Sequence, residues 1–478
     1  MKKYIFTFLA AATLWSCSNE DSLLDTEPQG NVSSNQIQEL LKTFPEKSLS
    51  VLSGAEAGNN NYLIQFNTNG QGAHDDFGYM SVLAGLDHMT NDLVMTSSHW
   101  FNTYYNYLAR NVNHTRNEMV WRFNYKVVYN MNEVLKLIPA DAEGDQNFVK
   151  GRALAVRANA YMDLIRTYAV GEQGIPYYSE GDNVISKAER VPTTEVWGYV
   201  TSDLEKAYTL LDGYGRTSKE FVNKNVVAGM LARAYMWTGN YAKAAQYANL
   251  AKQGFPLMNE AQLEDGFQFI SNPEWMWGAD INASTTNLYA SFFSHMSNLN
   301  DGYAGLLKIY RNIDSRLYSK ISDSDIRKNW FLGAAQGGLP KYANVKFYDD
   351  TFFEADLVYM RASEFYLIEA EALARSGNEA GAKAVLATFA KTRDPQYVTS
   401  TNSGAALLSE IRTQRKIELW GEGGEWWEMK RNKEDLTRIY TGSNHAAFGQ
   451  LNIPASDKRF YFDIPQKELD ANKEVSNP

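Results

Sequence analysis

The sequence predicts a mainly α-helical protein built from helical hairpins. Apolar residues recur at three- and four-residue spacing, as they do along the buried face of a helix; one such run is Val127, Val128, Met131, Val134, Leu135 and Ile138. Only 12 of the 478 residues are proline, which disfavours a turn-rich β architecture. Two later segments share a helix–turn–helix pattern, with Gly-Asn turns at residues 239–240 and 377–378.

The first 17 residues have the pattern of a lipoprotein export signal. A short basic start and an apolar run over residues 4–14 lead into Leu14-Trp15-Ser16-Cys17, which resembles a lipobox. We therefore expect a signal peptide over residues 1–16 and acylation of Cys17; a plain secretory signal with an incidental cysteine is the alternative. Cys17 is the only cysteine, so an internal disulfide and a multi-thiolate zinc site are both excluded.

Composition separates a tether from the folded part of the chain. Residues 17–35 are polar, with an acidic cluster, and are expected to tether the lipidated end to the first helix. We expect residues 36–215 and 216–478 to form two halves that pack as one unit. A helix is expected over residues 37–44, where Pro45 ends it.

The middle of the chain is predicted to alternate helical hairpins with loops. Residues 54–78 are rich in Gly and Asn and are expected to form a loop. Three pairs of helices follow, around residues 127–138 and 153–165, residues 227–237 and 241–252, and residues 369–373 and 379–382. The second pair resembles the tetratricopeptide pattern. An excursion over residues 255–350 contains a strand-like run at 274–281 and a polar, aromatic-rich section at 282–303.

Charge argues against nucleic acid as a partner, and hydropathy argues against a membrane-spanning helix after the signal. The formal net charge is −10, and no long basic stretch occurs, which argues against nucleic acid because phosphate contacts need Lys and Arg. After the signal, no apolar stretch approaches the 18 residues of a membrane-spanning helix.

No catalytic motif is found. The sequence contains no HExxH pair, no G-x-S-x-G elbow and no G-x-x-x-x-G-K-[ST] loop. His74-Asp75-Asp76 is the only local cluster of metal-ligand types, and we favour a solvated acidic loop over a cation site. We therefore predict no metal, no cofactor and no enzymatic activity.

Several segments together resemble the SusD/RagB family of outer-membrane lipoproteins. They occur in the family's order from residue 17 to residue 478: Cys17 to Asp21 with Leu24 to Gly30, Val226 to Ala251, Tyr359 to Gly377, Ile411 to Arg431, and Asp463 to Pro478. The resemblance implies a scaffold of four tetratricopeptide-like hairpins that forms a superhelix, with a loop-rich ligand-binding side.

The resemblance also implies a function. Members capture oligosaccharides at the cell surface and deliver them to a SusC-like TonB-dependent barrel, and the lipid anchor holds them to the outer membrane. A peptide-binding member of the same type of uptake system is the alternative. A glycosidase is a third possibility, which would need two carboxylates roughly 5–10 Å apart in a cleft.

Aromatic residues supply the candidate binding site. Trp100 to Tyr105 interleaves four rings with an amide and a hydroxyl, groups that suit stacking on sugar rings and bonding to their hydroxyls. The predicted ligand-binding residues are Trp100, Asn102, Tyr104, Tyr289 and Trp330. The pairs Trp275 with Trp277 and Trp426 with Trp427 are predicted to be core.

Overall fold

The computed structural model describes residues 34–182 and 188–477. Two compact units are distinguished, residues 1–51 and residues 52–478. Cys17, the signal peptide and most of the tether lie outside the described residues. The proposed division into halves at residue 215 stays a prediction. Within the described part of the chain, no helix combines the length and apolarity needed to cross a membrane.

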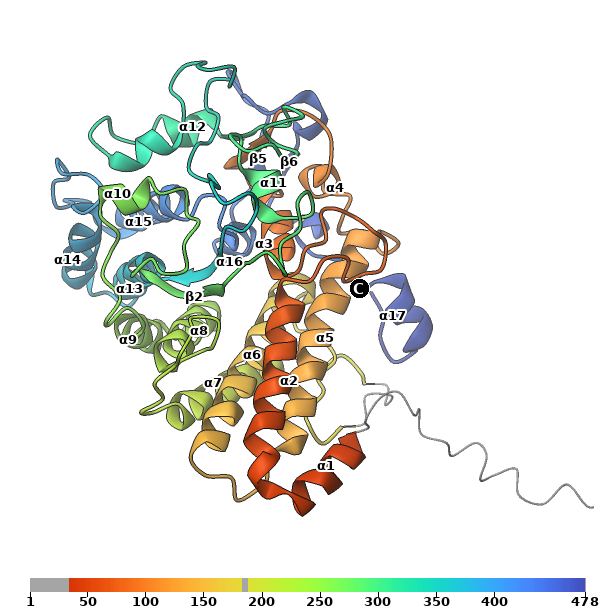
Figure 1. Cartoon of the computed structure of the whole chain (residues 1–478). Coiled ribbons are helices and arrows are strands. Elements are labelled where there is room, and N and C mark those ends of the chain that lie inside the picture. Colours follow the sequence, from red (N-terminus) through yellow and green to blue (C-terminus); the bar gives the residue numbers. More distant parts are fainter. Residues whose placement is uncertain (1–33, 183–187, 478) are drawn as a thin grey trace, which may run out of the picture. The chain divides into compact units, whose positions relative to one another are not determined.

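Long helices form the scaffold, and each packs on the next (Figure 1). Their bounds are α5 (Thr115–Leu137), α6 (Asp145–Tyr168), α7 (Thr193–Leu210), α8 (Lys224–Trp237), α9 (Tyr241–Ala251), α13 (Ala362–Arg375), α14 (Glu379–Ala390) and α15 (Gly404–Glu418). Packing runs from α5 through α6, α7 and α8 to α9, then to α13, which also contacts α14 and α15. The mainly α fold and the three predicted hairpins, α5–α6, α8–α9 and α13–α14, are confirmed.

One expected loop, residues 54–78, is confirmed over residues 64–78 but begins with a helix. Residues 54–63 belong to α2 (Ser48–Leu63) despite two glycines and three consecutive asparagines. The buried face of this helix repeats at helical spacing and comprises Leu52, Glu56, Asn59 and Leu63. Its polar members have partners on neighbouring helices: Arg152 of α6 pairs with Glu56 at 2.5 Å, and Asn130 of α5 donates to Asn59 at 3.1 Å. These tertiary contacts therefore outweigh the low helix propensity of glycine and asparagine in this segment.

Shorter elements fill the remainder, and the strands pair only in twos among the described residues. The pairs are β1 (Leu93–Met95) with β3 (Arg311–Ile313), β2 (Trp275–Ala279) with β4 (Leu357–Arg361), and β5 (Leu436–Thr437) with β6 (Asn452–Ile453), all antiparallel. The other helical elements are α1 (Ser34–Thr43), α3 (Tyr79–Asp87), α4 (Asn102–Tyr105), α10 (Glu260–Leu263), α11 (Phe292–Met296), α12 (Ser315–Tyr318), α16 (Glu425–Arg431) and α17 (Gln466–Ala471), with 3-10 turns η1 (Pro45–Lys47), η2 (Ile326–Trp330), η3 (Ala447–Gly449) and η4 (Lys458–Phe460).

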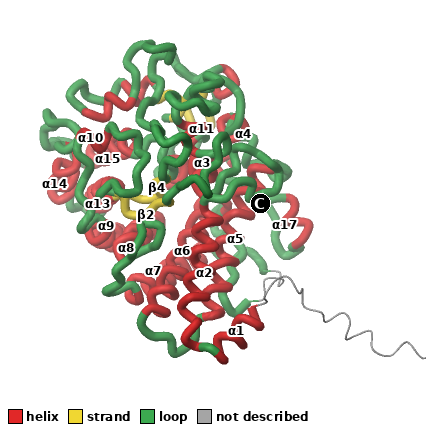
Figure 2. Tube along the Cα trace, in the orientation of Figure 1, coloured by secondary structure: helices red, strands yellow, loops and turns green. Residues whose placement is uncertain are grey.

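Loops gather on one side of this unit. Figure 2 shows the loop segments concentrated around α4, α10 and α11, whereas α5 to α8 are long and continuous. The strand-like run predicted at residues 274–281 is confirmed as β2. All four tryptophans predicted to be core, Trp275, Trp277, Trp426 and Trp427, are buried.

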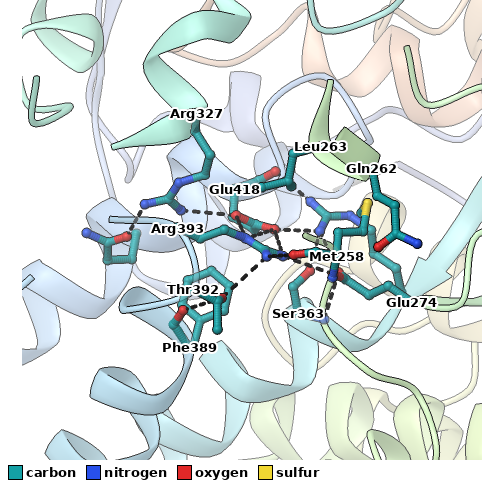
Figure 3. A network of polar contacts seen from close by, with 12 residues as sticks. Met258, Gln262, Leu263, Glu274, Arg327, Ser363, Phe389, Thr392, Arg393 and Glu418 are labelled. Atoms are coloured by element: carbon teal, nitrogen blue, oxygen red, sulfur yellow. Dashed lines mark hydrogen bonds and ion pairs between the residues drawn. The ribbon is translucent and has the colours of Figure 1, made fainter. Parts of the chain in front are cut away.

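A buried network of charges joins elements of the C-terminal part (Figure 3). Glu418, at the end of α15, accepts from Arg361 at 2.5 Å, Arg393 at 2.9 Å and Arg327 at 3.1 Å. Glu274, just before β2, pairs with Arg361 at 2.8 Å and with Arg393 at 2.9 Å. Burial alone would raise the pKa of Glu418, but the three guanidinium groups hold this pKa well below its ordinary value. Each buried charge thus has a partner, as burial requires.

Candidate functional site

Three buried rings anchor the segment that carries Trp100. Phe101 has a left-handed backbone (φ 69°), which is uncommon for a bulky residue. Its ring stacks on His88 at a centroid distance of 4.7 Å. Tyr104 and Tyr105, in the single turn of α4, are also fully buried. The preceding Trp100 remains half-buried and faces a group of other rings.

Tyr303 stands at the centre of that group. Its ring centroid lies 4.9 to 6.3 Å from those of His74, His99, Trp100, Tyr289 and His295. The contacting residues come from the loop after α2, the segment before α4, the segment before α11, and α11 itself. We call His74, His99, Trp100, Tyr289 and Tyr303 the aromatic cluster. The structure therefore brings Trp100 and Tyr289, two of the predicted residues, to one place.

Hydrogen bonds fix the base of the aromatic cluster. The Tyr303 hydroxyl lies 2.7 Å from Nδ1 of His74, and Nε2 of His295 lies 2.8 Å from the His74 carbonyl oxygen. Ser294 Oγ accepts from the Tyr303 backbone N–H at 3.1 Å. Burial, reinforced by Arg311, holds the pKa of His295 well below its ordinary value, so the His295 imidazole is uncharged at neutral pH.

Asp75 and Asp76, which lie beside the aromatic cluster, both have hydrogen-bond partners. Arg116 lies 5.7 Å from the Trp100 ring centroid, and its Nε donates to Asp75 at 2.8 Å. Asp76 accepts from Thr68 at 2.6 Å and from the backbone N–H of Asn69 at 2.8 Å. Both carboxylates are buried, so the expectation of a solvated acidic loop was wrong. Among the residues that the structure describes, no group of His, Cys, Asp or Glu is arranged to hold a metal ion.

The outward surface combines rings, aliphatic groups and amides. Tyr289 is 42% exposed, and His99 is also exposed. Exposed leucines lie on the same segments: Leu288, Leu299, Leu306 and Leu307. Asn102 is half-buried, and its side-chain oxygen, like the indole N–H of Trp100, has no hydrogen-bond partner. Both atoms are shielded in this conformation, so they reach a ligand only if their side chains turn.

Two predicted ligand-binding residues belong to the core instead. Tyr104 is 0% exposed, and its ring packs so closely on α3 that a Cβ at Gly85 would lie 2.7 Å from it. Trp330 is 1% exposed, and its indole N–H donates to the Leu263 carbonyl at 2.7 Å. Lys346 lies 4.4 Å from the Trp330 ring centroid. Both side chains are packed in the core, so neither belongs to the candidate site.

Tyr303 and His74 have only weak signals in the sequence. Tyr303 ends the aromatic-rich section 282–303, but nothing in its spacing connects it with Trp100, some 200 residues earlier. His74 drew attention only as part of the His74-Asp75-Asp76 cluster. Its role in the structure is to receive the Tyr303 hydroxyl, a contact that only the tertiary fold creates.

Two family profiles match this chain. The profile described as "SusD family" matches residues 265–478, and the one described as "Starch-binding associating with outer membrane" matches residues 61–236. The chain belongs to the SusD/RagB family. Proteins of this family are non-catalytic binding proteins, and the family description associates them with the outer membrane.

Individual relatives span nearly the whole chain. SusD-like protein P38 of Formosa agariphila is 22% identical, over 91% of this chain and 93% of its own. A SusD-like carbohydrate-binding protein from Bacteroides vulgatus is 26% identical, with a TM-score of 0.78 over 89% of this chain and 97% of its own. Surface glycan-binding protein A from Bacteroides thetaiotaomicron, solved with laminarihexaose, is 16% identical, with a TM-score of 0.70 over 90% and 99%. The tetratricopeptide-like arrangement of helices agrees with these folds.

Proposed function

We propose that the protein captures oligosaccharides through the aromatic cluster and does not cleave them. The observation that carries this proposal is the convergence of Trp100, Tyr289 and Tyr303 from separate segments on the loop-rich side of the unit. Aromatic rings offer flat apolar faces with polar edges, which match the C–H faces and hydroxyl groups of sugars. The laminarihexaose complex of a relative with the same fold supports a glycan as the ligand.

The electrostatics of the aromatic cluster favour an uncharged glycan. Burial lowers the pKa of His99, and Arg311 lowers it further, so this imidazole is neutral at physiological pH. Arg116 and Asp75 neutralise each other directly beneath Trp100. Recognition at the aromatic cluster is therefore expected to depend mainly on stacking and hydrogen bonds.

Substitution of single rings tests the proposal. Alanine at a central aromatic anchor commonly costs about 2 kcal/mol, which corresponds to a roughly 30-fold loss of affinity. We expect this loss for Trp100→Ala and for Tyr303→Ala in calorimetry against a panel of neutral oligosaccharides. Tyr199→Ala, which removes an exposed tyrosine from α7, serves as the control and should bind normally.

Three outcomes would contradict the proposal. Unchanged binding in the Trp100→Ala and Tyr303→Ala variants would place the site elsewhere. Shortened glycans in the mixture after incubation would reveal hydrolysis. Tight binding of extended peptides, with none of any oligosaccharide, would favour the peptide-binding alternative, in which backbone hydrogen bonds contribute much of the affinity.

We further propose that acylated Cys17 anchors the protein to the outer membrane, exposed at the cell surface, where it delivers glycans to a SusC-like TonB-dependent barrel. The lipobox-like Leu14-Trp15-Ser16-Cys17 and the family's association with the outer membrane support this. Several acyl chains on one cysteine hold a protein firmly, whereas a single chain gives marginal binding.

The Cys17→Ala variant should be released from membranes or left unprocessed, as judged by fractionation and intact mass. A processed variant that still sediments with the outer membrane would refute the anchor. Co-purification of a barrel with the native protein, and not with an unrelated lipoprotein, would support the delivery step. Its absence after crosslinking on intact cells would count against this step.

A further inference from the structure

A cavity lies apart from the aromatic cluster. It has a volume of about 480 Å³, within the usual range of small-molecule sites of about 300–1,000 Å³. Its walls come from α5, the segment around Tyr178, and α17, which Figure 1 shows beside α5. Two bonds hold α17 there: Lys467 pairs with Glu118 at 2.6 Å, and Trp121 donates to Glu468 at 3.3 Å. No residue lines both this cavity and the aromatic cluster.

Aromatic rings line one side of the cavity. Trp121, Tyr125 and Tyr129 follow one another at helical spacing on α5, and Tyr178 faces Tyr125 with a centroid distance of 6.1 Å. Trp121 is buried and lies 4.7 Å from Tyr125, whereas Tyr125, Tyr129 and Tyr178 are half-exposed. The Tyr129 hydroxyl makes no hydrogen bond to a described residue, whereas the Tyr178 hydroxyl receives one from the backbone of Ala188. These rings therefore present flat apolar faces, and Tyr129 also presents a free hydroxyl, to an occupant.

Two cations on the same wall lack an acidic partner. Arg122 and Lys126 lie one turn apart on α5, are exposed, and form no ion pair with any residue in the described part of the chain. Lys126 lies 4.3 Å from the Tyr129 ring centroid. Of the two carboxylates that line the cavity, Glu118 pairs with Lys467, whereas Glu468 accepts only from the uncharged donors Trp121 and Asn472.

We propose that this cavity binds a saccharide unit that carries a negative charge, such as a uronic acid or a sulfated sugar. The tyrosine faces would stack on the sugar ring, while Arg122 and Lys126 would bind its anionic group. A neutral sugar would leave both cations without a partner. The choice of a saccharide rests on the proposed function, whereas the preference for an anion rests on the unpaired cations.

The test compares glucuronic acid, glucose 6-sulfate and glucose by saturation-transfer NMR and calorimetry on the full-length mature protein. We expect both acidic sugars to bind and glucose to bind far more weakly. Because exposed charge pairs contribute modestly, the double variant Arg122→Gln/Lys126→Gln should lose roughly tenfold in affinity. Binding should also weaken as salt is added. Tyr129→Ala should reduce binding of both acidic sugars without a change in melting temperature.

Matched variants separate this site from the aromatic cluster. Lys383→Gln/Lys391→Gln removes the same charge from α14 and its C-cap and should bind normally, as should Trp100→Ala. If glucose binds as well as glucuronic acid, or if the Arg122/Lys126 variant binds normally, the proposal is wrong. Binding of a polyglutamate peptide, without binding of either acidic sugar, would also overturn it.

The two proposals can fail independently. If the binding of acidic sugars depends on Trp100 and not on Arg122 or Lys126, the proposed function stands and the cavity is not a binding site. Conversely, the protein could bind acidic sugars through Arg122 and Lys126 and bind no neutral glycan. That result would establish the cavity as a binding site and refute the aromatic cluster as a glycan site.

Discussion

At the residue scale, His88 supports the loop that presents Trp100. It is buried in α3's C-terminal cap position, where Nδ1 lies 2.6 Å from the Ala84 carbonyl and Nε2 accepts from Arg311 Nε at 2.7 Å. These partners require a neutral imidazole with its proton on Nδ1. Burial lowers the pKa of His88 well below 6.5, and Arg311 lowers it further. Protonation of His88 would place its positive charge next to that of Arg311, and the two would repel each other beneath the Phe101 ring that stacks on His88.

We predict that His88 stays neutral well below pH 6. Because the folded-state pKa is lower than the unfolded-state value, His88 contributes stability above about pH 6.5, and that stability is lost as the pH falls below it. The slope should reach about 1.4 kcal/mol per pH unit for this single group. NMR titration of the imidazole checks the first statement, and the free energy of unfolding at several pH values checks the second. An imidazole that titrates near pH 6.5 in the folded protein would contradict both.

The local sequence indicates only part of the candidate site: Trp100 and Tyr289 belong to it, whereas Tyr104 and Trp330 belong to the core. Trp100 and Tyr289 were found because aromatic rings stand among amides and hydroxyls in segments expected to be irregular. Their proximity depends on Tyr303, and a contact between residues 200 positions apart has no local signature. Trp330 was misread because its neighbours are charged, yet neighbouring Arg327 is itself buried against Glu418. Polar neighbours therefore did not indicate exposure.

At the element scale, close helix packing determines the effect of a small substitution. Gly229 lies in the middle of α8, where α8 meets the start of α13. A Cβ there would lie 2.4 Å from the ring of Phe365 and 2.9 Å from the sulfur of Met360, both buried. Gly198 of α7 offers a comparison, because no atom lies within 4 Å of its Cβ position.

The same substitution should have opposite effects at these two glycines. Alanine in a helix interior is intrinsically favoured over glycine by roughly 1 kcal/mol, so Gly198→Ala should stabilise the protein by about that amount. At Gly229 overpacking costs about 1–3 kcal/mol or more and outweighs the gain. Chemical denaturation of the two variants measures both changes. Stabilisation by Gly229→Ala would mean that α8 and α13 can move apart at little cost.

Elements with an apolar repeat were predictable, whereas α2 was not. Val127, Met131, Val134 and Leu135 mark α5 by their spacing alone. In α2 the repeat is equally regular, but two of its buried members are Glu56 and Asn59. Their burial depends on Arg152 and Asn130, which lie on other helices. A pattern search for apolar residues cannot detect a helix face whose members are satisfied by distant polar partners.

At the scale of the whole molecule, buried bonds join early and late parts of residues 52–478. Trp420 donates to the Asp92 carbonyl at 2.9 Å, and Trp427 donates to Thr167 Oγ1 at 3.0 Å. Arg438 donates to the carbonyls of His88 and Thr90 at 2.7 and 2.6 Å. If one part unfolds while the other stays folded, the buried donors and acceptors of these bonds lose their partners, which costs free energy. They favour unfolding of this unit as a whole.

We predict that calorimetry of the mature protein shows one main unfolding transition, and that Glu418→Gln moves this transition as a whole to lower temperature. The substitution leaves Arg327, Arg361 and Arg393 buried with one charged partner fewer, and breaking a buried ion pair costs about 3–5 kcal/mol. Glu143→Gln, at an exposed position, should leave the transition unchanged. Two resolved transitions, of which Glu418→Gln shifts only one, would show that the early and late parts fold independently despite the bonds between them.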